Sequence, residues 1–236
     1  MHERATISDR LFERLRMEIV SGALAEGSLH SIYALAERFD VSRTPTRDAV
    51  LRLAEAGLVT VERNRGVRVR GIGVDDIRRI FELRLLLEVP ATRFAAAHCT
   101  PERARLLEED LEVMRDAAQK DDVAAFVERD IMMHERILDA MGNDRLTAHV
   151  RALRELTLVM DASTFDRSRS LLDVHEEHLP IVDAVLAGDP RTAGDEMNRH
   201  LLQTARLLMR QVGDRTGEPL PDGWPDDLLA SASAPV

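Results

Sequence analysis

The feature that most constrains this fold is a helical repeat of apolar residues that runs through most of the chain. From residue 74 to about residue 211, apolar side chains recur every three or four positions, as on the buried face of an amphipathic helix. Turn-forming residues interrupt the repeat at 100–101, 119–122, 142–143, 163–170 and 188–190. The pattern predicts an all-helical bundle of six or seven helices over residues 72–212.

The first 71 residues follow a different pattern. Helical spacing predicts three short helices over about 6–21, 31–39 and 42–56, with Ser31 and Ser42 as N-caps. After them the period changes to two, because valines alternate with polar residues on both sides of a turn at 63–66. Three helices followed by a basic hairpin form a winged helix-turn-helix, so the predicted fold class is mostly α, with this domain over residues 1–71.

Residues 213–236 lack periodicity. They hold four of the nine prolines and the only tryptophan, which predicts a flexible tail. No apolar run approaches the roughly 18 residues that a bilayer span needs, and the first residues lack the apolar stretch of a signal peptide. The single cysteine, Cys99, excludes an intrachain disulfide framework. These features favour a cytoplasmic protein with no membrane partner.

The net charge of −10 is distributed unevenly along the chain. Residues 1–72 carry 12 arginines against 10 acidic residues, whereas the remainder carries 20 basic against 32 acidic residues. A slightly basic head on an acidic body can bind nucleic acid if its arginines converge on one face. The negative net charge therefore does not exclude DNA as a partner.

Basic and hydroxyl side chains gather at the start of the third predicted helix. Four of them stand in its first two turns: Arg43, Thr44, Thr46 and Arg47. Arginine suits bidentate contact with guanine, and threonine suits phosphate oxygens or a thymine methyl. The hairpin adds four arginines that could reach a minor groove or the backbone: Arg63, Arg65, Arg68 and Arg70. The alternative is a solvated helix face, which suits Arg68 or Arg70 alone better than the pair at the helix entrance.

In the C-terminal bundle, ionisable side chains lie in phase with the apolar stripes of three helices. They are Asp130 with His134, then His175 with His178, and finally His200. A carboxylate directed into a bundle core is costly unless it is paired or coordinated. One carboxylate with three imidazoles suits Zn²⁺ or Ni²⁺ better than Ca²⁺ or Mg²⁺. The residues alone leave a metal centre and separate buried histidines equally open.

Two further charges lie on the inner face of the first helix of the bundle. Arg84 is in phase with the apolar residues there, and Glu88 follows one turn later. One interpretation is an intrahelical ion pair at the rim. The other is that Arg84 binds the carboxylate of an organic-acid effector, because guanidinium forms a bidentate pair with carboxylate. With Arg154 and His175, these residues form the candidate effector-binding set.

The N-terminal motif resembles that of a known family. The segment from Val41 to Val59, VSRTPTRDAVLRLAEAGLV, followed by residues 63–69, closely resembles the DNA-binding domain of the GntR superfamily. The resemblance implies that Arg43, Thr44, Thr46 and Arg47 contact DNA and that Gly66 lies at the wing tip, beside Arg65. The chain departs from the family pattern at residues 30–33, His-Ser-Ile-Tyr, where many members have Leu-(Ser/Asn)-Glu.

A second resemblance covers residues 74–211. Asp130-x₃-His134, the segment from Glu177-His178 to Asp189, and Asn198-Arg-His200-Leu resemble the FCD effector domain of the FadR branch. This resemblance implies that Asp130, His134, His178 and His200 bind a divalent transition metal, zinc with nickel as the alternative. It also implies that His178, rather than His175, is the ligand.

Together these features predict a DNA-binding transcription regulator, a repressor or an activator. It would act as a homodimer on a palindromic double-stranded operator and respond to a small organic acid bound at the metal. One alternative is a helical metalloenzyme acting on small acids, which leaves the winged helix without a role. The other is a helical adaptor whose inward polar residues are structural.

Overall fold

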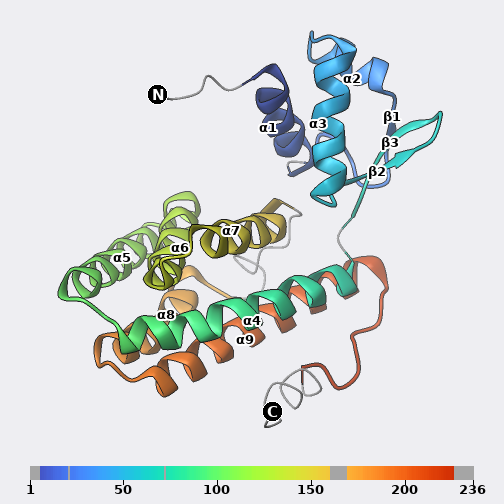
Figure 1. Ribbon diagram of the computed structural model, residues 1–236. Helices are drawn as coiled ribbons and strands as arrows, with labels where there is room; N and C mark the ends of the chain where they lie inside the picture. Colours follow the sequence, from blue (N-terminus) through green and yellow to red (C-terminus); the bar gives the residue numbers. More distant parts are fainter. Residues whose placement is uncertain (1–5, 21, 72, 160–168, 226–236) are drawn as a thin grey trace, which may run out of the picture. The chain divides into compact units, whose positions relative to one another are not determined.

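The computed structural model describes residues 6–20, 22–71, 73–159 and 169–225 (Figure 1). The chain divides into two compact units. The first comprises residues 1–72 with 156–162, and the second comprises residues 73–155 with 163–236. Most of the described residues are helical, which confirms the predicted fold class.

The first unit contains the three predicted helices and the predicted hairpin. Its helices are α1 (Ile7–Val20), α2 (Ile32–Arg38) and α3 (Arg43–Glu55), and its hairpin strands are β2 (Val59–Glu62) and β3 (Gly66–Val69). A two-residue strand that sequence patterning missed, β1 (Leu29–His30), pairs antiparallel with β3 on the side away from β2. Two residues are too few to show a period of two.

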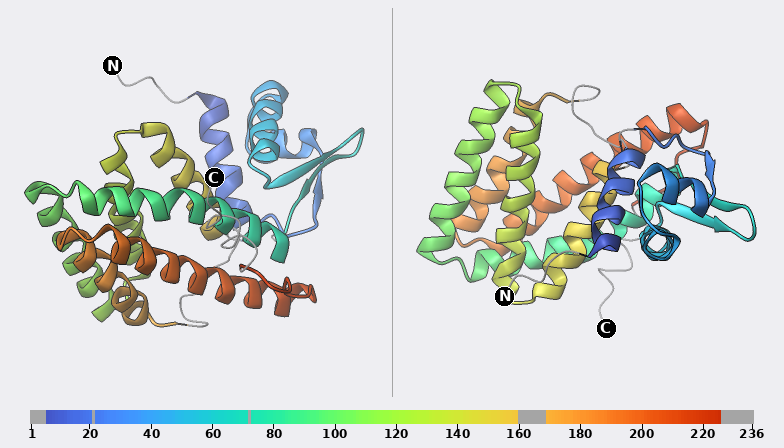
Figure 2. Two further views of the ribbon diagram at one scale, coloured as in Figure 1. Left: turned by 60° about the horizontal axis from the view of Figure 1, so that its bottom comes forward. Right: turned by 90° about the horizontal axis from the view of Figure 1, so that it is seen from above.

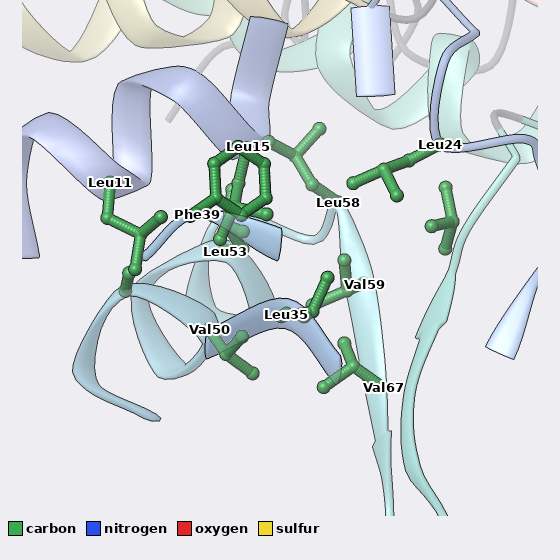
Figure 3. Close-up of a cluster of buried hydrophobic side chains, with 12 residues drawn as sticks. Leu11, Leu15, Leu24, Leu35, Phe39, Val50, Leu53, Leu58, Val59 and Val67 are labelled. Carbon is green, nitrogen blue, oxygen red and sulfur yellow. The ribbon is translucent and has the colours of Figure 1, made fainter. Parts of the chain in front are cut away.

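One apolar core joins the helices of this unit to its sheet (Figure 3). Leu11 and Leu15 of α1 are almost fully buried, as are Val50 and Leu53 of α3. Leu58 and three valines of the hairpin, Val59, Val67 and Val69, close the core from the sheet side. The hairpin is therefore fixed to the helices by its apolar face, while its turn carries the arginines.

Caps fix where the short helices begin and end. The Oγ of Ser31 accepts a hydrogen bond from the amide of Ala34 at 3.0 Å, which confirms the predicted N-cap of α2. Ser42 is the N-cap residue of α3, although its side chain makes no capping hydrogen bond. Gly57 follows α3 with φ of +75°, a left-handed conformation that lets the chain turn directly into β2.

The second unit is a bundle of helices. Its elements are α4 (Val74–Ala97), α5 (Pro101–Gln119), α6 (Val123–Leu138), the short 3₁₀ helix η1 (Asp139–Met141), α7 (Asp144–Val159), α8 (Leu171–Leu186) and α9 (Pro190–Thr216). In both views of Figure 2 and in Figure 1, α4 and α9 run side by side along the bundle. The helix α5 packs on α6 and α8, and α8 also packs on α9. No helix in the described ranges is both long enough and apolar enough to cross a bilayer.

The predicted helix breaks agree with these bounds except at one place. Most of the predicted break at 163–170 lies outside the described residues, which resume at Arg169. Ser170 then caps α8 through a reciprocal pair of hydrogen bonds with Asp173.

The prediction of a flexible tail from residue 213 is wrong for its first part. The helix α9 continues to Thr216, because Leu208, Met209 and Val212 extend its buried face. Beyond it, the Glu218 carboxylate accepts a hydrogen bond from the amide of Val74 at 2.6 Å. The indole Nε1 of Trp224 donates to Glu82 at 3.2 Å. This segment caps the start of α4, whose first amides have no partner within the helix. Residues 226–236 lie outside the described part.

Candidate DNA interface and metal centre

A groove of about 470 Å³ lies between α2 and the first turns of α3. Its lining comprises Ile32, Tyr33, Arg43, Thr44, Arg47 and Asp48. Three of the four residues predicted for this helix, Arg43, Thr44 and Arg47, are exposed here. Because helix N-termini and arginines both attract phosphate, the groove edge can bind a nucleic-acid backbone and present side chains to base edges.

Thr46 does not belong to this exposed set. Its side chain is fully buried, and its hydroxyl donates to the carbonyl of Ser42 at 2.9 Å. The helical phase explains the difference, because Thr46 lies on the same face as Ala49 and Val50, which pack into the core. The prediction that Thr46 contacts DNA is therefore corrected to a structural role at the start of α3.

Tyr33 is a member of the groove that the sequence analysis did not assign. Its side chain is 59% exposed, and the Arg43 guanidinium lies 5.2 Å from the centre of its ring. A cation–π contact of this kind restricts the arginine side chain at the edge of the groove. The indication in the sequence was the departure from the family pattern at residues 30–33, which places an aromatic residue at this position.

In the wing, the arginines differ in how they are held. Arg65 lies in the hairpin turn with its side chain 66% exposed and contacts Glu62 at 3.1 Å. Arg68 instead lies against Glu62 at 2.5 Å and donates to the carbonyl of Gly27 at 2.6 Å. Arg68 is therefore held within the domain, whereas Arg65 extends toward solvent.

Gly66 has a packing role that its predicted place at the wing tip does not explain. It pairs with Glu62 at the first position of β3, and its φ is +124°. A Cβ atom at this position would lie 2.2 Å from the carbonyl oxygen of His30. Because that oxygen belongs to the backbone of β1, the three-stranded sheet requires glycine here.

Replacing Gly66 by alanine is expected to disrupt the pairing of β1 with β3. The strained φ alone costs on the order of 1–3 kcal/mol, and the clash with the His30 carbonyl adds to it. Hydrogen exchange of the Val67 and Val69 amides, which face β1, should accelerate at least tenfold. Gly27→Ala is the matched control, because Gly27 also has positive φ but no atom within 4 Å of the added Cβ. Equal exchange in the two variants would contradict this role.

In the second unit, the structure brings the three predicted metal-ligating histidines together in one cluster. His134 of α6, His178 of α8 and His200 of α9 are buried, and their candidate ligand atoms all lie within 4.8 Å of one another. The Nε2 atoms of His134 and His178 are 3.3 Å apart. Nitrogen ligands about 2.0–2.1 Å from a tetrahedral ion are themselves separated by about 3.3 Å, so this spacing fits zinc geometry.

Asp130 supplies an oxygen to the same cluster. Its Oδ1 lies 3.0 Å from Nε2 of His178 and 3.9 Å from Nε2 of His134. Its Oδ2 accepts a hydrogen bond from Arg154 of α7. The spacing of four residues on α6 puts Asp130 and His134 on one face, as the sequence predicts.

Each histidine is oriented by a partner on its other ring nitrogen. Nδ1 of His134 contacts Glu88 at 2.7 Å, Nδ1 of His178 contacts the carbonyl of Val174 at 2.7 Å, and Nδ1 of His200 contacts Glu177 at 3.0 Å. Because all three partners are acceptors, each Nδ1 is placed to donate, and the Nε2 edge of each ring faces the cluster. Three ring nitrogens and a carboxylate that face one another fit a cation between them.

The pKa shifts of His134, His200 and Asp130 also favour metal binding. Burial, with the nearby Arg154 charge, lowers the pKa of His134 to about 4. Burial next to His178 and His134 lowers the pKa of His200 well below its ordinary value. Burial raises the pKa of Asp130, but Arg154 and His178 outweigh it and hold that pKa well below its usual range. At neutral pH the site therefore offers neutral His134 and His200 imidazoles and a carboxylate, the forms that bind metal.

The structure corrects the predicted position of Arg84. Arg84 is 4% exposed, and its Nε donates to Glu88 at 2.6 Å within α4. The pair is intrahelical, as one of the two interpretations states, but it lies in the core rather than at the rim. The second oxygen of Glu88 accepts from His134. Arg84 therefore fixes the carboxylate that orients a candidate ligand, and its contact with an effector stays a prediction.

The two remaining candidates for effector binding are placed differently. Arg154 is buried beside the cluster, in contact with Asp130 and 3.8 Å from Glu88. His175 points away from the cluster toward α5, where its Nε2 lies 3.2 Å from the carbonyl of Leu111. His175 is not among the three clustered histidines, and its assignment to the effector site stays a prediction.

A pocket of about 530 Å³ opens between α8 and α9 on the His200 side of the cluster. Its lining includes Arg169, Glu177, Arg199, His200 and Gln203. Neither Arg169 nor Glu177 was assigned a role from the sequence. The pocket brings solvent to the carboxylate that orients His200.

Comparison with known proteins agrees with both units. The family model for bacterial regulatory proteins of the gntR family matches residues 7–69, and the FCD domain model matches residues 79–203. The "Probable D-xylose utilization operon transcriptional repressor" of Paenarthrobacter nicotinovorans is 30% identical over 200 residues, which cover 84% of this chain and 87% of that protein.

Two further proteins extend the comparison. The "Gluconate operon transcriptional repressor" of Bacillus subtilis (strain 168) is 32% identical over 140 residues, which cover 59% of this chain and 57% of that protein. The structure of "E. coli McbR/YncC" shares the fold with a TM-score of 0.66 at 22% identity, and covers 87% of this chain and 98% of its own. The chain therefore belongs to the GntR family of transcription regulators, with an FCD effector domain that follows the DNA-binding domain in the sequence, and is not an enzyme.

Proposed function

We propose that this regulator binds an operator through Arg43, Thr44, Arg47 and the wing residue Arg65, and that a metal-bound effector controls this binding. The observation that carries the proposal is the convergence of three Nδ1-anchored imidazoles and the Asp130 carboxylate in the domain attached to the reading head. Two distinct sites in one chain are what coupling between effector and operator requires.

We infer that the metal is zinc, with nickel as the alternative, and that its ligands are Asp130, His134, His178 and His200. The 3.3 Å spacing of two Nε2 atoms and the set of three nitrogens with one oxygen support this choice. When bound, the metal would coordinate an oxygen ligand as a Lewis acid. Arg154, which contacts Asp130, would pair with the negative charge of that oxygen ligand.

We propose a small carboxylate as the effector. A carboxylate can bind the metal through oxygen, and Arg154, which contacts the candidate ligand Asp130, can pair with its charge. One relative is named for a gluconate operon, and gluconate is a hydroxycarboxylate. In this proposal the metal and Arg154 recognise the effector, and Arg84 supports them by holding Glu88, which contacts His134.

We also propose that the protein is a cytoplasmic homodimer. One reading helix covers a single half-site, so a palindromic operator calls for two copies. The helix α4 has an exposed apolar stripe that includes Leu83, Leu86 and Phe94, which are 49%, 53% and 37% exposed. This stripe is the surface we expect a second copy to cover, and sedimentation at micromolar concentration would measure the stoichiometry.

One experiment tests the proposed function by measuring operator affinity in the presence of zinc and small carboxylates. With an operator selected from random duplexes, a panel of small carboxylates should change the operator Kd of zinc-loaded protein by roughly 5–150-fold for the cognate acid. Zinc at about 100 times its Kd should stabilise the protein by about 2.7 kcal/mol.

Both effects should disappear in His134→Ala, whereas His149→Ala, which replaces an exposed histidine of α7, should retain them. If the wild type and His134→Ala bind equal amounts of zinc, the metal centre is refuted. A zinc-loaded protein whose DNA affinity no carboxylate changes would refute the proposed effector class.

A further inference from the structure

The three candidate histidine ligands differ in how their Nδ1 atoms are held. His134 is held by a carboxylate in the core, and His178 is held by a backbone carbonyl. His200 is held by Glu177, whose side chain is 17% exposed and lines the pocket between α8 and α9. Of the three, His200 therefore depends on a side chain that solvent reaches.

Glu177 is itself fixed by charged and polar neighbours. The Oε2 atom that contacts His200 also accepts from Arg169 at 2.5 Å, and Oε1 accepts from Gln203 at 2.8 Å. The Arg169 side chain is only 6% exposed, so its contact with the Glu177 carboxylate is largely shielded from solvent.

Arg169 is also linked to the backbone of α9, the helix that carries His200, through the hydroxyl of Thr204. Its second terminal nitrogen donates to Oγ1 of Thr204 at 3.2 Å, and that hydroxyl donates to the carbonyl of His200 at 3.0 Å. Residues 200, 203 and 204 occupy one face of α9, so the helix periodicity presents all three to α8.

We propose that Glu177, held by Arg169 and Gln203, is the positioning residue that sets the tautomer and the direction of the His200 ring. The adjacent residues Glu177 and His178 thus have complementary roles on α8. His178 turns inward as a ligand, and Glu177 orients the ligand contributed by α9. A hydrogen-bond acceptor on Nδ1 keeps the proton there, aims Nε2 at the cluster and makes the ring a stronger donor. For its effect on metal, this inference rests on the proposed metal centre.

The first test uses full-length protein without metal. Long-range ¹H–¹⁵N NMR correlations assign the proton of the His200 ring to one nitrogen. We expect the Nδ1–H form in the wild type, and a shift toward the Nε2–H form in Glu177→Ala. Glu177→Gln should restore the Nδ1–H form in part, since its amide oxygen can still accept. A His200 ring that carries its proton on Nε2 in the wild type would overturn the proposal.

The second test measures zinc affinity by competition with a chromophoric chelator and the visible spectrum of the Co²⁺ form. Glu177→Ala should weaken zinc binding by roughly 10–100-fold and alter the Co²⁺ spectrum, with Gln intermediate. The control is Glu176→Ala, which removes the neighbouring exposed carboxylate from the same pocket and should change affinity less than twofold.

These two tests separate this inference from the proposed metal function. Equal zinc affinity and an unchanged tautomer in Glu177→Ala would overturn the positioning role and leave the metal centre standing. A wild type that binds neither zinc nor cobalt, but in which Glu177→Ala still changes the tautomer, would refute the metal centre and support the positioning role.

Discussion

Replacing Arg43 and Arg47 together by alanine is expected to abolish sequence-specific binding to the operator and to leave zinc binding unchanged. Both side chains are exposed at the groove between α2 and α3. A bidentate arginine–guanine contact contributes about 1–3 kcal/mol of discrimination, so two contacts together correspond to roughly 30-fold to more than 10⁴-fold in affinity. Fluorescence anisotropy with the selected operator and a scrambled duplex measures this loss.

The matched control removes two other arginines from the same domain. Arg38→Ala with Arg52→Ala deletes the same charge, but these side chains pair with Glu18 and Asp9 rather than lining the groove. We expect this control to weaken binding to the two duplexes to a similar, smaller extent, with a salt dependence typical of lost phosphate attraction. Retained discrimination in the first double variant, or an equal loss in the control, would contradict the assignment of the reading surface.

Glu88→Ala is expected to have the largest effect on stability. Glu88 is 1% exposed and lies between Arg84, at 2.6 Å, and His134, at 2.7 Å. Its removal leaves the Arg84 charge in the core without this partner, a change that typically costs about 3–5 kcal/mol. It also removes the acceptor that orients His134, which should weaken zinc binding by roughly 10–100-fold. Urea unfolding of the metal-free protein measures the loss in the free energy of unfolding.

The chain contains a matched pair in a different environment. Arg105 and Glu109 have the same i, i+4 spacing on α5, but their side chains are 66% and 50% exposed. Glu109→Ala should therefore cost no more than about 1 kcal/mol. Replacing both members of the buried pair, as Arg84→Met with Glu88→Leu, should recover much of the lost stability because no uncompensated charge remains. A small cost for Glu88→Ala would show that water reaches Arg84.

Periodicity predicted most of the fold because it reports directly on burial. The three helices of the head and the hairpin appear where apolar spacing places them, and Ser31 caps α2 as expected. The four residues Asp130, His134, His178 and His200 could be chosen because each lies in phase with an apolar stripe, although polar side chains there are costly. A short window of sequence contains that information.

The partners of these residues could not be chosen in this way. Glu177 lies beside His200, 23 residues away, because α8 packs on α9, and sequence spacing does not give the rotation of one helix against another. Thr46 shows a related limit, since residues that suit DNA and residues that cap a helix turn are of the same types. Arg84 was placed correctly on the inner face, but only the fold shows that Glu88 and His134 occupy that face with it.

The half-buried indole of Trp224 has a practical consequence. It is the only tryptophan in the chain, and its Nε1 donates to Glu82 on α4. Indole emission depends on hydrogen bonding and on exposure to water. The native protein thus carries one intrinsic fluorophore at the first half of α4, and its emission reports the packing of the C-terminal segment there without an added label.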